Sequence, residues 1–259
     1  MEIPKELKGK ELYSFLKENK NDLIYAKKSA IKTSDSISSV SLMGNNIDAK
    51  KGFSNDNKDE IKVRAIINTT NVIDSHKDVH LDGIWNKSLK ENKNIKFLQE
   101  HKMSFKTIIA DRDDLKVSSN NVSWKSLGYD FEGKTDALTF DATIKRDRNK
   151  EMFKEYSEGN VDNHSVGMQY VKMELALYSE DEDYEEEKAV WDKYIDKIAN
   201  KDVAMKSGYF WAISEAKVIE GSAVVMGSNS FTPTIESEKQ TKEIIETKDN
   251  AIVEWLKNN

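Results

Sequence analysis

Several short stretches of the sequence alternate apolar with polar residues, and this alternation restricts the fold more than any other feature. In 61–67, Ile61, Val63, Ala65 and Ile67 alternate with the charged residues Lys62 and Arg64, and Leu138, Phe140, Ala142 and Ile144 share a face in 138–144. Successive side chains of a strand point to opposite faces, so this period of two predicts half-buried strands. Further predicted strands lie at 95–101, 106–110, 122–127, 163–171, 209–213 and 218–225. The sequence predicts a mainly β fold of the α+β class, with antiparallel strands and helices in the connections.

Helical periodicity and composition predict the limits of the core. A helical pattern covers residues 1–34, and a short helix follows Asn149, a predicted N-cap, and ends at Gly159. An acidic run over 179–187 leads into a further amphipathic helix. The predicted organisation is a helical N-terminal segment with a polar linker (1–59), a core (60–233) with an acidic, helical insertion (178–207), and a C-terminal polar arm with a short helix (234–259).

Charge and composition narrow the classes of partner. The formal net charge is −6 and no basic stripe is present, which predicts no general affinity for nucleic acid. No apolar run approaches the ~20 residues of a membrane span, so no membrane partner is predicted. The chain has no cysteine, which fits a reducing compartment and excludes thiol catalysis. We therefore expect a soluble protein of a cytoplasm.

The predicted strand at 163–171 contains the candidate nucleophile, Ser165. On a strand, Ser165 and Gly167 share one face, whereas His164 points to the other and is a poor base for that serine. A glycine beside the serine is interpreted as space through which a substrate backbone approaches.

A serine hydroxyl becomes nucleophilic only when an imidazole removes its proton and a third group orients the imidazole. His101, at the end of a predicted apolar strand, is the candidate base. Glu220 lies among apolar residues and is the candidate third member, with Glu215 in reserve. The alternative is that these are an ordinary strand-end histidine and strand-edge carboxylates.

A second hypothesis concerns His76, His80 and Asp78. The two histidines have the i, i+4 spacing of a helical metal pair, and a metal-dependent hydrolase would use them with Asp78. However, the segment reads as a turn. Asp74 and Asp78 are interpreted as turn residues whose carboxylates accept backbone N–H bonds, and no metal is predicted.

Three islands of sequence together resemble the prohead (capsid-maturation) serine proteases of tailed bacteriophages, which are similar in fold to the herpesvirus assemblins. The islands, in chain order, are Asp74–Val79 with Leu98–His101, His164–Met168, and Ile213–Val225. The resemblance covers residues 60–233 and leaves both arms outside. It implies an assemblin-like antiparallel β-barrel core, with histidine, serine and acidic roles on His101, Ser165 and Glu220.

The resemblance also implies an activity. We expect an endopeptidase that cleaves phage scaffold and the N-terminal regions of the major capsid protein, within the assembling prohead in the host cytoplasm. It implies no cofactor. Self-cleavage of the arms and self-association through the C-terminal helix are left open. The alternative is a non-catalytic scaffold or capsid-associated structural protein with the same fold.

Overall fold

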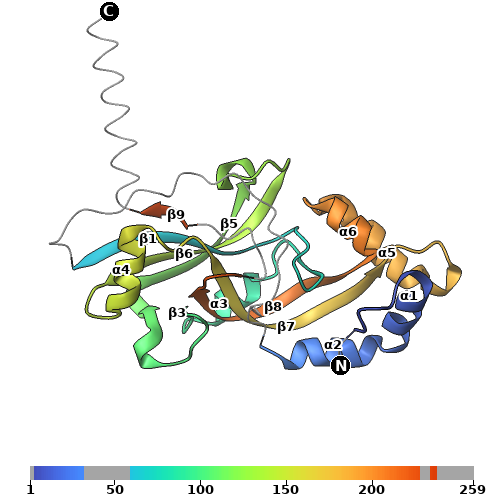
Figure 1. Cartoon of the computed structure of the whole chain (residues 1–259), viewed down its shortest axis with the longest axis horizontal. Helices are drawn as coiled ribbons and strands as arrows, with labels where there is room; N and C mark the ends of the chain where they lie inside the picture. The colour runs from blue at the N-terminus through green and yellow to red at the C-terminus, as the bar shows by residue number, and fades with distance from the viewer. Residues whose placement is uncertain (1–2, 32–58, 228–233, 238–259) are drawn as a thin grey trace, which may run out of the picture.

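The computed structural model describes residues 3–31, 59–227 and 234–237, and its fold is α+β (Figure 1). The helices are α1 (Gly9–Glu18), α2 (Lys20–Ser29), α3 (Asn86–Glu91), α4 (Lys150–Glu158), α5 (Glu185–Tyr194) and α6 (Lys201–Ser207). The strands are β1 (Glu60–Thr69), β2 (Asp78–His80), β3 (Lys96–Gln99), β4 (Ile108–Ala110), β5 (Leu115–Ser123), β6 (Lys134–Lys145), β7 (His164–Leu177), β8 (Tyr209–Ala223) and β9 (Thr234–Ser237).

The long strand β8 is the centre of the first of two sheets. β7 pairs with it antiparallel along one edge, while β2 and β3 pair with it parallel, one after the other, along the opposite edge. β4 then pairs antiparallel with β3. In the second sheet the order is β5-β6-β1-β9 and every pair is antiparallel. β7 and β8 run beside each other along the length of the molecule (Figure 1).

The expected closed antiparallel barrel is wrong, because the described strands form two open sheets and two of the pairs are parallel. A barrel requires its edge strands to be joined by hydrogen bonds, whereas these sheets meet through side chains. Gly221 of β8 marks the meeting point: a Cβ added there would lie 2.6 Å from Phe140 of β6 and 2.8 Å from Ile67 of β1. The missing side chain lets the two sheets approach closely.

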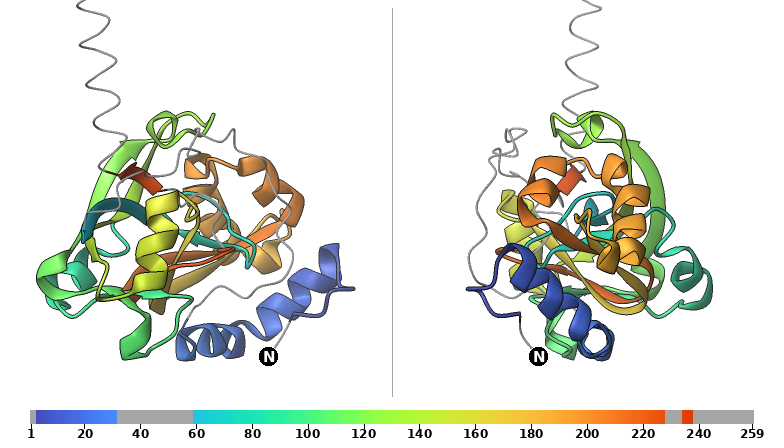
Figure 2. Two further views of the ribbon diagram at one scale, coloured as in Figure 1. Left: turned by 60° about the vertical axis from the view of Figure 1, so that its left-hand side comes forward. Right: turned by 90° about the vertical axis from the view of Figure 1, so that its right-hand side faces the viewer.

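The predicted helix after Asn149 is confirmed. The Asn149 side chain accepts a hydrogen bond from the Met152 N–H (3.1 Å), and Gly159 ends the helix in the left-handed region (φ 74°). This helix, α4, lies at one end of the long axis, and α1, α5 and α6 gather at the other (Figures 1 and 2). Among the described helices, none is long and apolar enough to cross a membrane.

Other predicted elements have different limits. The helical pattern over 1–34 is divided at Asn19 into α1 and α2. The strand expected at 122–127 starts earlier, as β5, and gives way to a 3-10 turn at Lys125–Leu127. β9 adds four residues of the predicted C-terminal arm to the edge of β1. The predicted short helix near the C-terminus and the linker up to residue 58 lie outside the described residues.

Two lysines of helix α2 form ion pairs with buried carboxylates of the core. Lys27 pairs with Asp78 of β2, which is fully buried, and Lys20 lies 2.6 Å from Glu187 of α5. The Tyr170 hydroxyl also donates to Asp78 (2.8 Å). Burial, followed by the negative charge of Asp78, raises the pKa of Tyr170 well above its ordinary value, so this phenol stays protonated.

Asp74 and Asp78 therefore play different parts. Asp74 accepts the backbone N–H groups of His76 (2.8 Å) and Asp78 (2.9 Å), which confirms its predicted turn role. The same prediction is wrong for Asp78, because its carboxylate turns into the core, where the Lys27 ammonium compensates its charge.

Lys27→Met is expected to lower the free energy of unfolding by about 2 kcal/mol, because it leaves the Asp78 carboxylate buried without its cation. Urea denaturation of the full chain measures the change. Lys28→Met is the matched control: Lys28 is adjacent on α2 and makes no ion pair within the described part of the chain, so a small effect is expected. Equal effects of the two substitutions would show that the Lys27–Asp78 pair does not hold α2.

Candidate active site

Strands on both edges of β8 bring the predicted site residues to one sheet face. Ser165 of β7 is the direct partner of Ser222 of β8, and Gly167 is the partner of Glu220. Directly opposed residues of an antiparallel pair share a face. His101 follows β3, which pairs with β8 on its other edge up to Gln99 and Ala223.

His101 and Glu220 are in direct contact. The Nδ1 atom of His101 donates to Oε1 of Glu220 over 2.6 Å, and the glutamate is 2% exposed. A short bond between an imidazole and a carboxylate fixes the ring orientation and the tautomer. The other ring nitrogen, Nε2, is buried and has no hydrogen-bond partner among the described residues. The arrangement therefore leaves one imidazole nitrogen to serve as a base.

Ser165 lies on the same face and is 5% exposed. No hydrogen bond joins it to His101 in the part of the chain that the structure describes. Its cross-strand partner Ser222 accepts a hydrogen bond from the His101 backbone N–H (3.0 Å). The structure thus joins two of the three predicted residues directly and places the third, Ser165, on the strand that neighbours Glu220.

Gly167 has a different role from the one predicted. A Cβ atom at this position would lie 1.9 Å from Oε1 of Glu220 and 2.7 Å from its carboxyl carbon. The space above the glycine is therefore filled by the glutamate carboxylate and is not open to a substrate backbone. Gly167 lets Glu220 lie flat across β7 and reach His101.

Ser222 is a member of this cluster that the sequence interpretation missed. Its hydroxyl donates to Oε2 of Glu220 (2.6 Å) while accepting the His101 N–H. Glu100 and His101 both have left-handed backbones (φ 53° and 56°), which are uncommon for residues with side chains. Ser222 stands two residues after Glu220 on one strand, so the period of two was a usable signal for it.

Two other predicted residues lie outside the cluster. His164 bonds through Nε2 to the Tyr156 hydroxyl of α4 (2.9 Å), which agrees with its predicted exclusion as the base for Ser165. Glu215, the reserve acid, lies 2.6 Å from Lys172 and 3.3 Å from Lys87. The hydrogen bond from Lys172, and after it the one from Lys87, lowers the pKa of the Glu215 carboxyl group.

His76 and His80, the candidate metal pair, contact other side chains of the core and of the turn. His80 contacts Asn68 through Nδ1 (3.3 Å) and Tyr170 through Nε2 (3.0 Å), and it is buried. Nδ1 of His76 lies 3.9 Å from Asp74. Within residues 3–31, 59–227 and 234–237, no three histidine or acidic side chains come together as a metal site.

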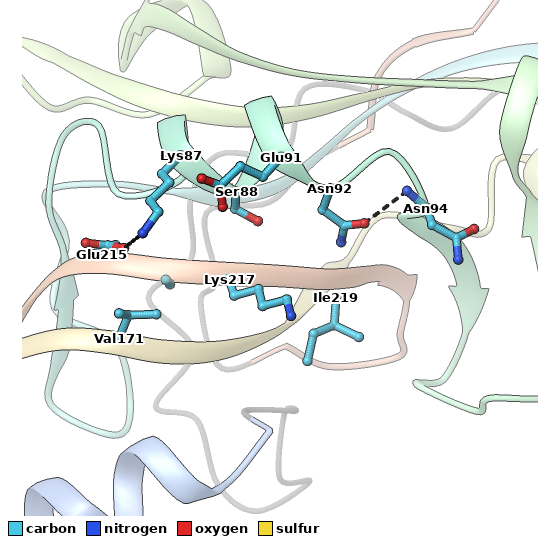
Figure 3. A pocket seen from close by; sticks show the side chains of 10 residues that line it. Lys87, Ser88, Glu91, Asn92, Asn94, Val171, Glu215, Lys217 and Ile219 are labelled. Carbon is cyan, nitrogen blue, oxygen red and sulfur yellow. Dashed lines mark hydrogen bonds and ion pairs between the residues drawn. The ribbon is translucent and has the colours of Figure 1, made fainter.

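A pocket of about 590 Å³ lies between α3 and β8. Lys217 is the cross-strand partner of Gln169, which shares a face with Ser165 and Gly167, and Ile219 directly precedes Glu220. Figure 3 shows α3 as the opposite wall, with Lys87 reaching down to Glu215. The pocket therefore lies between α3 and the part of β8 that precedes Glu220, and none of Ser165, His101 and Glu220 lines it.

Comparisons with protein-family models, with curated proteins and with solved structures found no match to this chain.

Proposed function

We propose that this protein is a serine endopeptidase of the prohead-protease type, with Ser165 as nucleophile, His101 as general base and Glu220 as the group that orients His101. The observation that best supports it is the 2.6 Å bond from His101 Nδ1 to a buried carboxylate, which leaves Nε2 for a hydroxyl. The order of the three islands along the chain agrees with the resemblance to the prohead proteases, and the relation of this α+β fold, without its closed barrel, to that of the assemblins is part of this proposal.

In the proposed reaction, Nε2 of His101 removes the Ser165 proton as Oγ attacks the scissile carbonyl carbon. Transfer requires the two atoms to approach within about 2.6–3.2 Å, and general-base action contributes about 10²–10⁴ in rate. The Glu220 carboxylate stabilises the imidazolium that forms. The imidazolium then protonates the leaving amine, and water, activated by the same nitrogen, hydrolyses the acyl-enzyme.

The substrates proposed are the scaffold and the N-terminal region of the major capsid protein of a tailed phage, inside the assembling prohead. This part of the proposal depends on the resemblance.

A fluorophosphonate probe tests the proposed nucleophile, because it phosphonylates only serines activated by a neighbouring base. We expect one adduct on the full chain, located at Ser165 by mass spectrometry, and no adduct on Ser165→Ala. The nearby Ser222 provides an internal check, since its proton is directed to Glu220. An adduct at Ser222, or none at all, would contradict the assignment, and the absence of any adduct would favour the non-catalytic structural protein.

A further inference from the structure

Ser222 contacts both members of the His101–Glu220 pair, and we propose that it is the positioning residue of the site. The inference rests on the proposed function for its catalytic meaning. Its hydroxyl has one proton, donated to Oε2 of Glu220 (2.6 Å), and its lone pairs accept the backbone N–H of His101 (3.0 Å). The side chain is fully buried, so water does not replace either bond.

The first bond fixes the carboxylate. A glutamate has two equivalent oxygens and several rotamers, and here Oε1 accepts from His101 while Oε2 accepts from Ser222. Ser222 holds Oε2 there, from a position two residues along the same strand. Donation to an ionised carboxylate is a charge-assisted bond, roughly twice as strong as a neutral one.

The second bond fixes the backbone of the base. β3 stops pairing with β8 at Gln99, and the chain then passes through two left-handed residues, Glu100 and His101. A left-handed backbone costs about 1 kcal/mol in a residue with a side chain, so it persists only where its surroundings enforce it. The Glu100 N–H is held by the Ala223 carbonyl (2.9 Å) and the His101 N–H by Ser222. Ser222 thereby fixes the position of the His101 backbone as well as that of the Glu220 carboxylate.

The test compares Ser222→Ala, Ser222→Thr and Ser214→Ala in the full chain. Threonine retains the hydroxyl, and Ser214 is an exposed serine of the same strand and so a matched control. We expect Ser222→Ala to slow the maximal rate of fluorophosphonate labelling at Ser165 by about 10- to 100-fold, the equivalent of one lost hydrogen bond to a charged group. Probe affinity should be unchanged. Threonine should restore the rate, and Ser214→Ala should leave it unaltered.

A second readout does not depend on activity. The Nδ1 proton of an imidazole bonded to a carboxylate gives a proton NMR signal far downfield, assigned here by its loss in His101→Ala. Ser222→Ala should shift or abolish this signal, whereas Ser222→Thr should retain it. If Ser222→Ala does not fold, Ser222→Cys fills the position with a weaker donor and should change both readouts in the same direction.

The two readouts separate the failures. A wild-type protein that the probe does not label contradicts the proposed function, and the NMR signal alone then decides on Ser222. An unchanged signal in folded Ser222→Ala overturns the positioning role. So does a wild-type labelling rate in that variant.

Discussion

Glu220→Gln is expected to slow labelling of Ser165 by about 10²–10⁴-fold while leaving the fold intact. Glutamine has the size of glutamate, so the space above Gly167 remains filled. Its amide nitrogen, however, can donate to Nδ1 of His101, which favours the tautomer with the proton on Nε2. A protonated Nε2 cannot accept the Ser165 proton, and no carboxylate charge remains to stabilise the imidazolium.

Glu215→Gln is the matched control for this prediction. Glu215 lies on the same strand, but its carboxylate binds Lys172 and Lys87, away from the imidazole. Its replacement should change the labelling rate by no more than a few-fold, in keeping with a partly exposed ion pair. Wild-type labelling of Glu220→Gln would remove the 2.6 Å His101–Glu220 bond from the mechanism. A large loss of labelling rate in Glu215→Gln would instead show that the ion pairs of Glu215 beside the α3 pocket contribute to the reaction.

The elements that the sequence predicted best are those specified by local patterns. The period of two in 61–67 and 138–144 became β1 and β6, and the cap and left-handed glycine around 149–159 became α4. The three-residue strand β2 was too short to have a period, and its residues resemble a turn in composition. The parallel pairing of β2 and β3 with β8 depends on contacts far apart in the chain, so antiparallel neighbours were the wrong default.

Side-chain contacts were likewise predictable from the sequence only in part. The pairing of His101 with Glu220 was predictable, because a buried carboxylate requires a partner and the resemblance supplied a histidine. The buried ion pair of Asp78 was not, since its cation comes from Lys27, some fifty residues earlier in a separate helix. Gly167 was identified as a gap, but a missing side chain does not reveal which atoms occupy the space. The register of β7 on β8 decides that, and it brings Glu220 opposite the glycine.

Gly167→Ala, a substitution on β7, is therefore expected to disrupt the His101–Glu220 pair although neither residue is changed. The new methyl group would lie 1.9 Å from Oε1 of Glu220, so the carboxylate must leave its position and release Nδ1 of His101. We expect labelling of Ser165 to slow by at least about 10²-fold, as for loss of the orienting carboxylate. The free energy of unfolding should fall by about 1–3 kcal/mol, because the displaced carboxylate loses its hydrogen bonds to His101 and Ser222 inside a packed site.

A double-mutant cycle with Glu220→Ala tests this steric account without relying on activity. Once the carboxylate is truncated, the methyl group at position 167 has space. In the Glu220→Ala background, Gly167→Ala should therefore lower the free energy of unfolding by less than about 0.5 kcal/mol, because the effects of two residues in direct contact are not additive. Urea denaturation of the four proteins gives the coupling energy. Equal costs in both backgrounds would show that the glycine serves the β7 backbone and not the glutamate, because a clash with an absent carboxylate cannot persist.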